Sequence, residues 1–408
     1  MSKKFLDLFA GIGGFNQGLK DLGYKHVNIV GEIDEHCKQT YSENYSEGQR
    51  IEFTDVSEIH KNNMTDEEIN KKYPDVDLIT GGFPCQSFSS AGNKKGFKDE
   101  TKGTLFFDLA RIVEVKKPKY FMFENVKHIV RHDNGNTWKV IMETIKELGY
   151  ITTKEPLIVS PRDFGLLQNR ERVFMLGVRK DLLPDNTEWL PYDTDFKKEE
   201  DKGLEKIENI LEKHVDSKYI VNEKLNIALS AWGELIRQVK LIEGKTIPVL
   251  WLHSIFSNED TTNYPSWKIK YIEQMKEFYE YNKEVFDAWM DKYHPLENWK
   301  IRETKLEWQA GKDNNEIKNT LIQFRQSGIR CKKIDKFPTL VAMVQIPCLY
   351  DYENNHFRYL TPRETARLQG FPEDFIIDKF DHQAYKQFGN AVHVKVVHKV
   401  MKRLLESI

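Results

Sequence analysis

The chain has few cysteines and no long apolar run, and each absence excludes a class of protein. Its 408 residues include only four cysteines, Cys37, Cys85, Cys331 and Cys348, and none forms a CxxC pair. This spacing argues against a zinc site and a disulfide scaffold, and it suits a reducing compartment. Apolar runs stay short of the ~20 residues of a membrane span, and Asp7 interrupts the first run too early for a secretory signal. We therefore expect a cytoplasmic protein with no bound metal and no membrane contact.

A strong net charge is missing as well. Lysines and arginines number 61 against 63 aspartates and glutamates, so the formal charge is -2. A nucleic-acid-binding face would therefore be a local basic patch on a nearly neutral protein. Charged residues make up 30% and apolar residues 39% of the chain, as is usual for a globular protein. The length allows two or three domains with a sizeable core.

The first 180 residues alternate between two kinds of pattern. Short apolar runs typical of strands lie at residues 4–9, 26–30, 76–80, 120–123 and 172–178. Helical patterns lie between them, from a glycine turn to residue 22 and at residues 34–45, 105–115 and 137–148. This alternation predicts an α/β domain, doubly wound around a mostly parallel sheet. Ligands of such sheets bind beyond the carboxyl ends of the strands.

The rest of the chain predicts a second, smaller domain. Residues 181–216 are rich in Lys, Glu and Asp and indicate a linker. Residues 219–293 are helical in pattern and aromatic, and residues 321–359 are strand-like. We expect Trp232 to Trp289 to belong to a core, with stacking platforms for bases as the alternative. A cap followed by proline at Thr361-Pro362 predicts a helix start, and residues 392–405 predict an amphipathic helix.

A thiol lies in a glycine- and serine-rich loop directly after a predicted strand. Cys85 follows Pro84 within residues 81–89. A cysteine at a strand end, beside small residues and a rigid proline, is placed to act as a nucleophile. The alternative is a silent cysteine that serves as a small core residue.

The glycine turn at residues 9–15 indicates a ligand that approaches the backbone. Its pattern lacks the third glycine of GxGxxG, because Asn16 stands there, so a nicotinamide cofactor is disfavoured. Glu32 ends the next strand, where an acidic residue can hold a ribose diol. Together they indicate a nucleoside cofactor, with a glycine turn used only for packing as the alternative.

Two further polar groups lie at strand ends. Glu124 closes an apolar strand, where lost solvation raises the pKa of a carboxyl group and suits it to carry a proton. A helix-capping pair with Asn125 is the alternative. Arg170 and Arg172 alternate with Glu171 before the last strand, and taken alone they indicate a solvated edge.

In order along the chain, these motifs closely resemble those of the cytosine-C5 DNA methyltransferases. The matching stretches are DLFAGIGGF (7–15), GGFPCQSFS (81–89), GTLF (103–106), ENV (124–126), QNRERV (168–173), LTPRETARLQGFP (360–372) and QFGNAV (387–392). They span the chain apart from about residues 181–323. The resemblance implies a Rossmann-like catalytic domain, S-adenosyl-L-methionine as methyl donor, and double-stranded DNA as substrate, methylated at cytosine C5 within a specific sequence. It also implies base flipping, because C5 is otherwise hidden in the duplex.

The resemblance also implies roles for individual residues. Cys85 would attack C6 of the cytosine, Glu124 would donate to N3, and Arg172 would hold O2. Arg170 would order the cysteine loop or meet phosphate. The donor site would be lined by Phe9, Gly11, Gly13, Gly14, Glu32, Ile33, Asp55, Pro84, Leu105 and Asn390. Among these, Glu32 would bind the ribose, with Ile33 and Asp55 at the adenine.

Recognition of DNA is expected from the central region. By resemblance, residues 1–180 form the catalytic domain, residues 181–360 a linker and target-recognition domain with a helical insertion, and residues 361–408 a segment that packs back on the catalytic domain. DNA contacts are expected from Gln86, Ser87, Arg325, Arg330, Lys332, Lys333 and Thr339. The basic residues of this set meet phosphate or form a solvated turn, and the sequence does not single out an arginine that reads a guanine.

Two alternatives share much of this pattern. Transfer-RNA cytosine-C5 methyltransferases have the same fold and motifs, although the long central region favours duplex DNA. A non-catalytic DNA-binding relative would have a decayed site, whereas Cys85, Glu124 and Arg172 are all present. We expect a monomer that belongs to a restriction-modification system, with a cognate restriction endonuclease acting separately.

Overall fold

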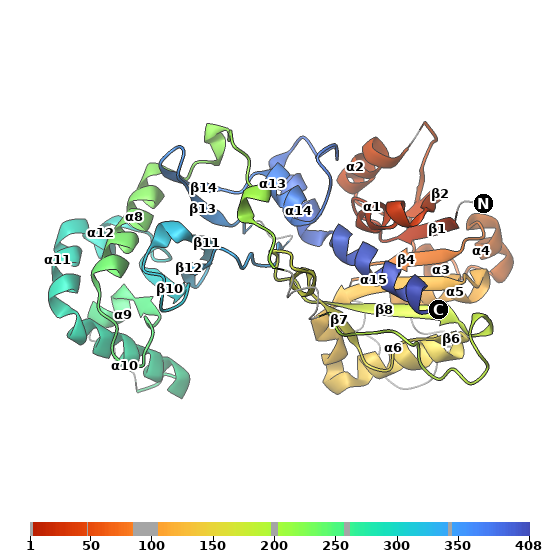
Figure 1. The fold of residues 1–408 in the computed structure, drawn as a ribbon, viewed down its shortest axis with the longest axis horizontal. Coiled ribbons are helices and arrows are strands. Elements are labelled where there is room, and N and C mark those ends of the chain that lie inside the picture. Colours follow the sequence, from red (N-terminus) through yellow and green to blue (C-terminus); the bar gives the residue numbers. More distant parts are fainter. Residues whose placement is uncertain (1–2, 47, 85–104, 197–202, 257–261, 342–344) are drawn as a thin grey trace. The chain divides into compact units, whose positions relative to one another are not determined.

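The computed structural model describes residues 3–46, 48–84, 105–196, 203–256, 262–341 and 345–408 (Figure 1). The chain forms two compact units. The first unit comprises Met1–Glu205 and Ala366–Ile408, and the second comprises Lys206–Thr365. These boundaries differ from the expected ones at residues 180 and 360. The first unit extends further because Leu190, Tyr192 and Phe196 are buried in its core.

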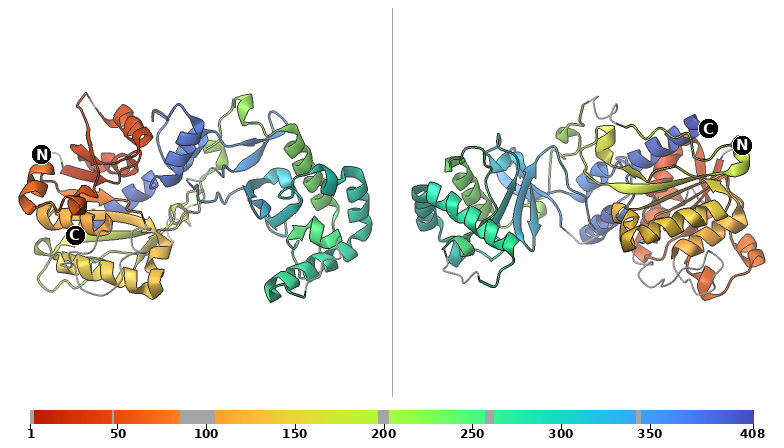
Figure 2. Two further views of the ribbon diagram at one scale, coloured as in Figure 1. Left: turned by 180° about the vertical axis from the view of Figure 1, so that it is seen from behind. Right: turned by 90° about the horizontal axis from the view of Figure 1, so that it is seen from below.

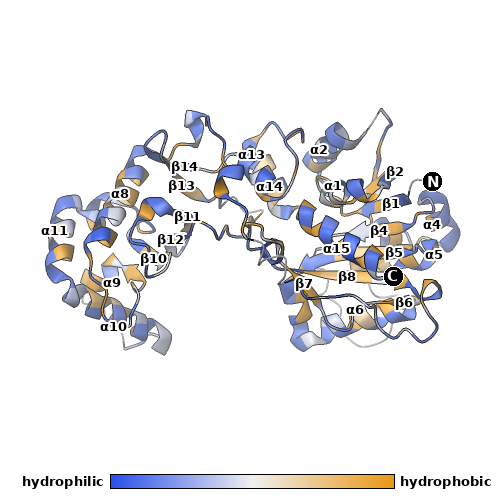
Figure 3. Cartoon of the chain, viewed as in Figure 1, coloured by the Kyte–Doolittle hydropathy of each residue, from blue (hydrophilic) through white to orange (hydrophobic). Residues whose placement is uncertain are grey.

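An eight-stranded sheet organises the first unit. Its strands are β1 (Lys3–Leu8), β2 (Tyr24–Gly31), β3 (Glu52–Thr54), β4 (Leu78–Gly81), β5 (Tyr120–Val126), β6 (Tyr150–Ile151), β7 (Leu157–Val159) and β8 (Arg172–Arg179). Their order is β3-β2-β1-β4-β5-β8-β6, and β7 pairs with β8. The first five strands run parallel, whereas β8 is antiparallel to β5, β6 and β7. The expected strands are present, and Figure 3 shows β5 and β8 largely in the hydrophobic colour.

Helices cover both faces of this sheet (Figures 1 and 2). They are α1 (Gly14–Leu19), α2 (Glu35–Tyr45), α3 (Glu58–Lys61), α4 (Asp66–Lys72), α5 (Leu105–Lys116), α6 (Asn136–Glu147), α14 (Asp381–Asn390) and α15 (Val394–Ser407). Alternate residues of a strand face opposite layers. Phe5 and Met122 belong to the core shared with α1 and α15, whereas Leu6 and Phe123 belong to the core shared with α5 and α6. The unit is therefore a doubly wound α/β fold.

The direction of β8 places its first residue at the functional edge of the sheet. Val126, the last residue of β5, pairs with Arg172, the first residue of β8. A parallel strand would have placed Arg172 at the opposite edge. An apolar run predicts a strand but not its direction, so the sequence did not show this.

The second unit is built on a mixed six-stranded sheet with helices beside it. The strands are β9 (Leu250–Trp251), β10 (Lys305–Gln309), β11 (Thr320–Arg325), β12 (Gly328–Lys333), β13 (Cys348–Asp351) and β14 (His356–Tyr359), in the order β14-β13-β11-β12-β10-β9. The helices are α8 (Glu223–Gln238), α9 (Leu252–Phe256), α10 (Ser266–Tyr281), α11 (Lys283–Tyr293) and α12 (Pro295–Asn298). Trp232 and Trp289 are buried in the core as expected, whereas Trp267 is exposed.

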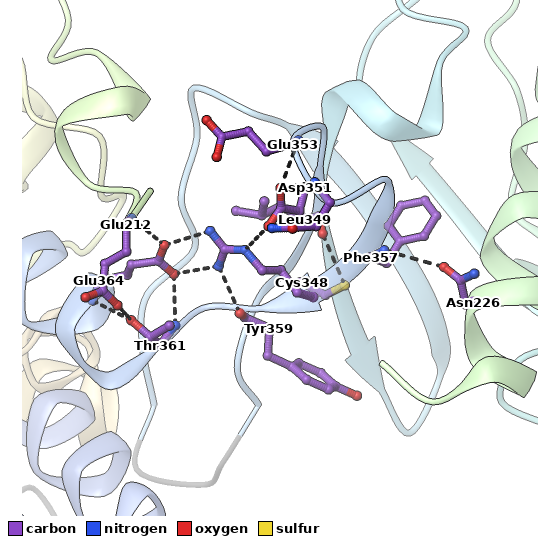
Figure 4. A network of polar contacts seen from close by, with 12 residues as sticks. Glu212, Asn226, Cys348, Leu349, Asp351, Glu353, Phe357, Tyr359, Thr361 and Glu364 are labelled. Atoms are coloured by element: carbon purple, nitrogen blue, oxygen red, sulfur yellow. Dashed lines mark hydrogen bonds and ion pairs between the residues drawn. The ribbon is translucent and has the colours of Figure 1, made fainter. Parts of the chain in front are cut away.

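A buried network of ion pairs and hydrogen bonds lies near the C-terminal end of the second unit (Figure 4). Arg358 makes two hydrogen bonds of 2.8 Å to the carboxylate of Glu364, and its Nε lies 3.1 Å from Asp351. Glu364 also accepts from the backbone N–H groups of Thr361 and Glu212. The Thr361 hydroxyl caps α13 (Pro362–Leu368) by accepting from the N–H of Glu364, so the helix start predicted at Thr361-Pro362 is confirmed. The network joins residue 212 to the strand that precedes this helix.

No helix in the described part of the chain is both long and apolar enough to cross a membrane.

Candidate active site

A cavity of about 710 Å³ opens at the carboxyl edge of the first unit's sheet. The segments that follow β1, β2, β3 and β4 line it, together with the end of β5, the start of β8 and the end of α14. Its volume lies in the range of small-molecule sites. The topology thus gathers residues that are far apart in sequence at the edge where parallel sheets bind ligands.

Glu32 is held in this cavity by backbone donors. Its Oε2 accepts from the N–H of Gly11 at 2.8 Å, and its Oε1 accepts from the N–H groups of Ile33 and Asp34 at 2.7 and 2.8 Å. The three bonds join the turn after β1 to the turn after β2. They fix the carboxylate in place before any ligand arrives.

The glycine turn serves two different purposes. Phe9 and Gly11 have positive φ angles of 55°, and both line the cavity. Gly13 and Gly14 are not among the residues that line it, and their contact with the donor stays a prediction. A Cβ on Gly13 would lie 2.2 Å from the Tyr45 ring, and one on Gly14 would lie 2.7 Å from the Val392 carbonyl oxygen. These two glycines allow close packing behind the turn.

Five other expected donor-site residues line the same cavity: Ile33, Asp55, Pro84, Leu105 and Asn390. Ile33 is 66% exposed, so the cavity presents an apolar wall that a planar base could cover. Asp55 accepts from the N–H and the hydroxyl of Ser57 at 2.9 and 2.6 Å, and from Lys61 at 3.1 Å. These bonds hold the pKa of the Asp55 carboxyl below its usual value, against the opposing effect of its partial burial.

Glu124 and Arg172 form an ion pair on one wall of the cavity. Arg172 Nε lies 3.0 Å from Glu124 Oε1, and both side chains are mostly buried. Burial raises the pKa of Glu124, whereas the charges of Arg172 and Arg170 lower it. Arg172 Nη1 donates to the Glu171 carbonyl at 2.9 Å. The wall therefore offers a carboxyl group with a raised pKa and an N–H donor beside it.

Arg170 also lines the cavity, although its side chain is buried. It is 3% exposed, and its Nη2 donates to the carbonyl of Ala391 at 3.0 Å. Burial and the neighbouring Arg172 lower its pKa, whereas Glu124 opposes them. The contact with Ala391 joins the segment before β8 to the C-terminal segment. The expected roles of Arg170, ordering the cysteine loop or meeting phosphate, stay predictions.

The residue after Glu124 has a function that the sequence analysis missed. The side-chain amide of Asn125 donates to the carbonyl oxygen of Phe83 at 2.8 Å, and Asn125 is buried. It therefore fixes the main chain just before Pro84-Cys85. Asn125 was treated only as a cap, although its place in a motif beside a strand end was a signal. Cys85, Gln86 and Ser87 lie outside the described residues.

The expected DNA-contacting residues of the second unit are only partly brought together. Arg325, Arg330 and Lys332 lie on one face of the β11–β12 hairpin, since Gln323 pairs with Arg330 and Arg325 with Gly328. Arg330 is already bound, because its Nε and Nη2 lie 2.7 and 2.6 Å from Glu307 Oε2. Lys333 is exposed on the same strand, and Thr339 is half-buried outside the hairpin.

Comparison with protein families shows to which family the chain belongs. The model of the C-5 cytosine-specific DNA methylase family matches residues 3–406, nearly the whole chain. The chain belongs to this family. The resemblance seen in the sequence is thereby confirmed. This methylase is an enzyme, a DNA (cytosine-5-)-methyltransferase, and its methyl donor is S-adenosyl-L-methionine.

Similar proteins cover the full length of the methylase. Type II methyltransferase M1.ScrFI of Lactococcus lactis subsp. cremoris is 32% identical over 406 residues, which is 99% of this chain and 78% of that protein. Type II methyltransferase M.HpaII of Haemophilus parainfluenzae is 31% identical over 406 residues, 99% and 89% of the two chains.

Solved structures with this fold are more distant in sequence. Dnmt2 methyltransferase of S. pombe superposes with a TM-score of 0.53 at 17% identity, over 99% of this chain and 98% of that one. The Entamoeba histolytica methyltransferase EhMeth gives 0.54 at 15%, over 100% and 98%. Both support the fold alone.

The cavity of the methylase fits its donor. S-adenosyl-L-methionine carries a ribose diol, a planar adenine base and a cationic sulfonium. Glu32 offers carboxylate oxygens to the diol, exposed Ile33 offers an apolar surface to the base, and the cavity also contains Asp34 and Asp55. The residues present therefore suit the chemical groups of the donor.

Proposed function

We propose that this methylase methylates C5 of a cytosine flipped out of double-stranded DNA, through a transient bond between Cys85 and C6. One observation carries the proposal: the Glu124–Arg172 pair lines the same cavity as Glu32, and the main chain that enters this cavity leads directly to Cys85. An acid, an N–H donor, the donor site and the nucleophile's segment thus belong to one site.

The reaction needs a nucleophile because C5 of cytosine is itself weakly nucleophilic. In the proposed scheme, the Cys85 thiolate donates an electron pair to C6, and the ring electrons move towards N3 and C5. C5 then bonds to the methyl carbon, whose former bonding pair stays on the donor's sulfur. The C5 proton passes to water, the electron pair of that bond restores the ring, and Cys85 leaves as a thiolate.

Glu124 and Arg172 stabilise the ring while its electrons move. A protonated Glu124 donates to N3, which becomes more basic as the thiolate adds, and burial favours this protonated form. Arg172, which lines the cavity, donates to O2, where negative charge develops. Their mutual contact at 3.0 Å orients both groups before the base enters.

Base flipping explains why the cysteine segment follows glycines. The target base must leave the stack, at a cost of a few kcal/mol. Gly81 would carry a Cβ only 2.5 Å from Leu109, so it is fixed by packing. Gly82 has no atom closer than 3.6 Å to its Cβ position, and that atom is Glu124 Oε2. Gly82 thus keeps the space beside Glu124 open for the incoming base.

The names of the relatives support a biological role. M1.ScrFI and M.HpaII are named type II methyltransferases. We infer that this methylase protects one DNA sequence in a restriction-modification system, as a monomer in the cytoplasm, with the cognate endonuclease as a separate protein.

Methyl transfer from labelled S-adenosyl-L-methionine to duplex DNA and to transfer RNA tests the proposal. Nucleoside digestion should yield labelled 5-methyldeoxycytidine from DNA and no labelled product from transfer RNA. The Cys85→Ser variant should lose methyl transfer while it binds the donor nearly as tightly as the wild type. Label on transfer RNA alone would overturn the DNA substrate, and turnover by Cys85→Ser would overturn the covalent route.

A further inference from the structure

The second unit contains a cavity of about 690 Å³ with its own chemistry. Its polar lining consists of two guanidinium groups, from Arg302 and Arg325, and two amide side chains, from Gln326 and Gln345. Phe324 and Tyr359 supply aromatic walls, with their ring centroids 6.0 Å apart. None of its described lining residues is a carboxylate. Arginine and glutamine are the side chains that pair with the major-groove edges of guanine and adenine.

Arg325 stands out within this cavity by its position in the hairpin. It is the last residue of β11, directly before the turn to β12, and it is half-buried. Ile322, Ile329 and Cys331 of the same hairpin belong to the hydrophobic core. Because strand residues alternate between faces, Arg325 projects from the face of the hairpin opposite to these three residues.

The neighbouring arginines Arg302 and Arg330 each lie near a carboxylate. Arg330 is bound to Glu307 through two contacts, and Arg302 Nε lies 4.0 Å from Glu303. For Arg325, in contrast, the described residues provide no hydrogen-bond or ion-pair partner. Burial and the charges of Arg330 and Arg325 lower the pKa of Lys332, so the cations on this face crowd one another. A half-buried guanidinium without a protein partner has N–H donors available for a ligand that accepts hydrogen bonds.

We propose that Arg325 reads a guanine of the recognised DNA sequence, with its guanidinium on N7 and O6, and that the cavity receives this base-pair edge. The inference rests on the proposed DNA substrate. Arginine presents two parallel N–H donors that match N7 and O6 of guanine. Gln326 and Gln345 flank it and contact the adjoining base pair. Arg330 holds the hairpin through Glu307 and does not read a base.

The test begins from the sequence that the wild-type protein methylates, identified by bisulfite sequencing of DNA from cells that express it. Duplexes are then made in which each guanine of this sequence is replaced in turn by 7-deazaguanine, which lacks N7. We expect the wild-type kcat/KM to fall roughly tenfold to a hundredfold at one guanine. Arg325→Ala should show a similar loss on the unmodified duplex and no further loss at that guanine.

Two further variants distinguish recognition of the guanine from the effect of positive charge and from a loss of folding. Arg325→Lys keeps the positive charge but not the paired donors, so it should bind DNA within a few fold of wild type and lose the preference for that guanine. Arg237→Ala removes an arginine that pairs with Glu316 outside the cavity, and it should keep the wild-type preference at every position. Thermal melting verifies that each variant is folded.

The outcomes either support or overturn the proposal. It is overturned if wild type and Arg325→Ala respond alike to 7-deazaguanine at every position. It is also overturned if Arg325→Ala slows all duplexes equally, including those with altered sequence, because that result indicates a phosphate contact. In both cases methylation by the wild type would persist, so failure here is distinct from failure of the DNA substrate or of the Cys85 route.

Discussion

The cavities of the two units hold their polar groups in opposite ways. In the first unit, Glu32 accepts three backbone hydrogen bonds and Glu124 is paired with Arg172. In the second unit, Arg325 lines a cavity in which no described residue is a carboxylate. A group that stabilises a reacting ring must be oriented beforehand. A group that reads a base must keep its donors available until DNA arrives.

Two arginine–glutamate pairs show the same contrast at the level of single residues. Arg358 and Glu364 are 2% and 0% exposed, and Arg358 also contacts Asp351 and the Tyr359 carbonyl. Arg172 and Glu124 are 17% and 13% exposed, and both line the cavity. An arginine enclosed by protein acceptors supports the fold, whereas one that lines a cavity can bind a substrate.

Among the described residues that line the first unit's cavity, replacing Glu124 should have the largest effect on kcat. Glu124→Gln removes the proton that we assign to N3, so kcat should fall by about 10²- to 10⁴-fold, as for other general acids. The Kd of S-adenosyl-L-methionine should stay close to the wild-type value. Single-turnover methylation and calorimetric titration of the donor measure the two quantities.

The pH dependence sharpens this prediction. Because burial raises the pKa of Glu124, its carboxyl group stays protonated to a higher pH than an exposed glutamate. Activity that needs this proton should decline as the pH rises through that raised value, and Glu124→Gln should lack the decline. The matched control is Glu171→Gln, which alters an exposed glutamate paired with Lys127. An identical pH profile in all three proteins would contradict the role of Glu124.

Glu32→Ala should weaken donor binding and leave DNA binding unaffected. The variant removes a charged acceptor from the diol and also releases the three backbone N–H groups that it organises. We expect a rise in the Kd of S-adenosyl-L-methionine of roughly tenfold to a hundredfold. Glu35→Ala, at an exposed neighbour on α2, is the control. An unchanged Kd in Glu32→Ala would remove the ribose assignment.

The buried carboxyl group of Asp7 provides a test of the core behind the donor site. It is fully buried, accepts from the Thr80 hydroxyl at 2.8 Å, and burial raises its pKa to about 7. The folded protein therefore binds this proton more tightly than the unfolded chain, whose aspartate titrates near 4. The resulting stabilisation is complete below pH 4 and is lost as the pH rises to about 7.

Asp7→Asn lacks this titration and should be less sensitive to pH. Between pH 5 and pH 8, the free energy of unfolding of the wild type should fall by about 2 to 3 kcal/mol relative to Asp7→Asn, at 1.36 kcal/mol for each pKa unit. Urea denaturation at the two pH values measures this difference. A constant difference would show that Asp7 is ionised in the folded protein.

Most of the sheet in the first unit could be predicted from sequence, because its buried strands are short apolar runs beside glycines. Residues 120–123 and 172–178 were assigned correctly as strands, and β5 extends to Val126. The direction of β8 could not be predicted, because an apolar run does not indicate whether its strand pairs in a parallel or an antiparallel manner. The helix α14 was not predicted, since residues 381–390 carry mixed polar and aromatic side chains without a clear cap.

The site could be predicted where function depends on residue type, and not where it depends on packing or distant partners. Glu32 and Glu124 line the cavity as expected, whereas Gly13 and Gly14 carry the same glycine signal but pack against Tyr45 and Val392. Arg325 and Arg330 are alike in sequence. They differ because Glu307, 23 residues from Arg330, neutralises only one of them.

Covalent trapping tests the central claim most directly. A duplex that carries 5-fluorocytosine at the target position cannot release the C5 substituent, so a bond from Cys85 to C6 should persist. In the presence of S-adenosyl-L-methionine, we predict a stable protein–DNA adduct for the wild type, attached at Cys85 in a peptide map, and none for Cys85→Ser. An adduct on another residue, or methylation of ordinary DNA without any adduct, would contradict the account.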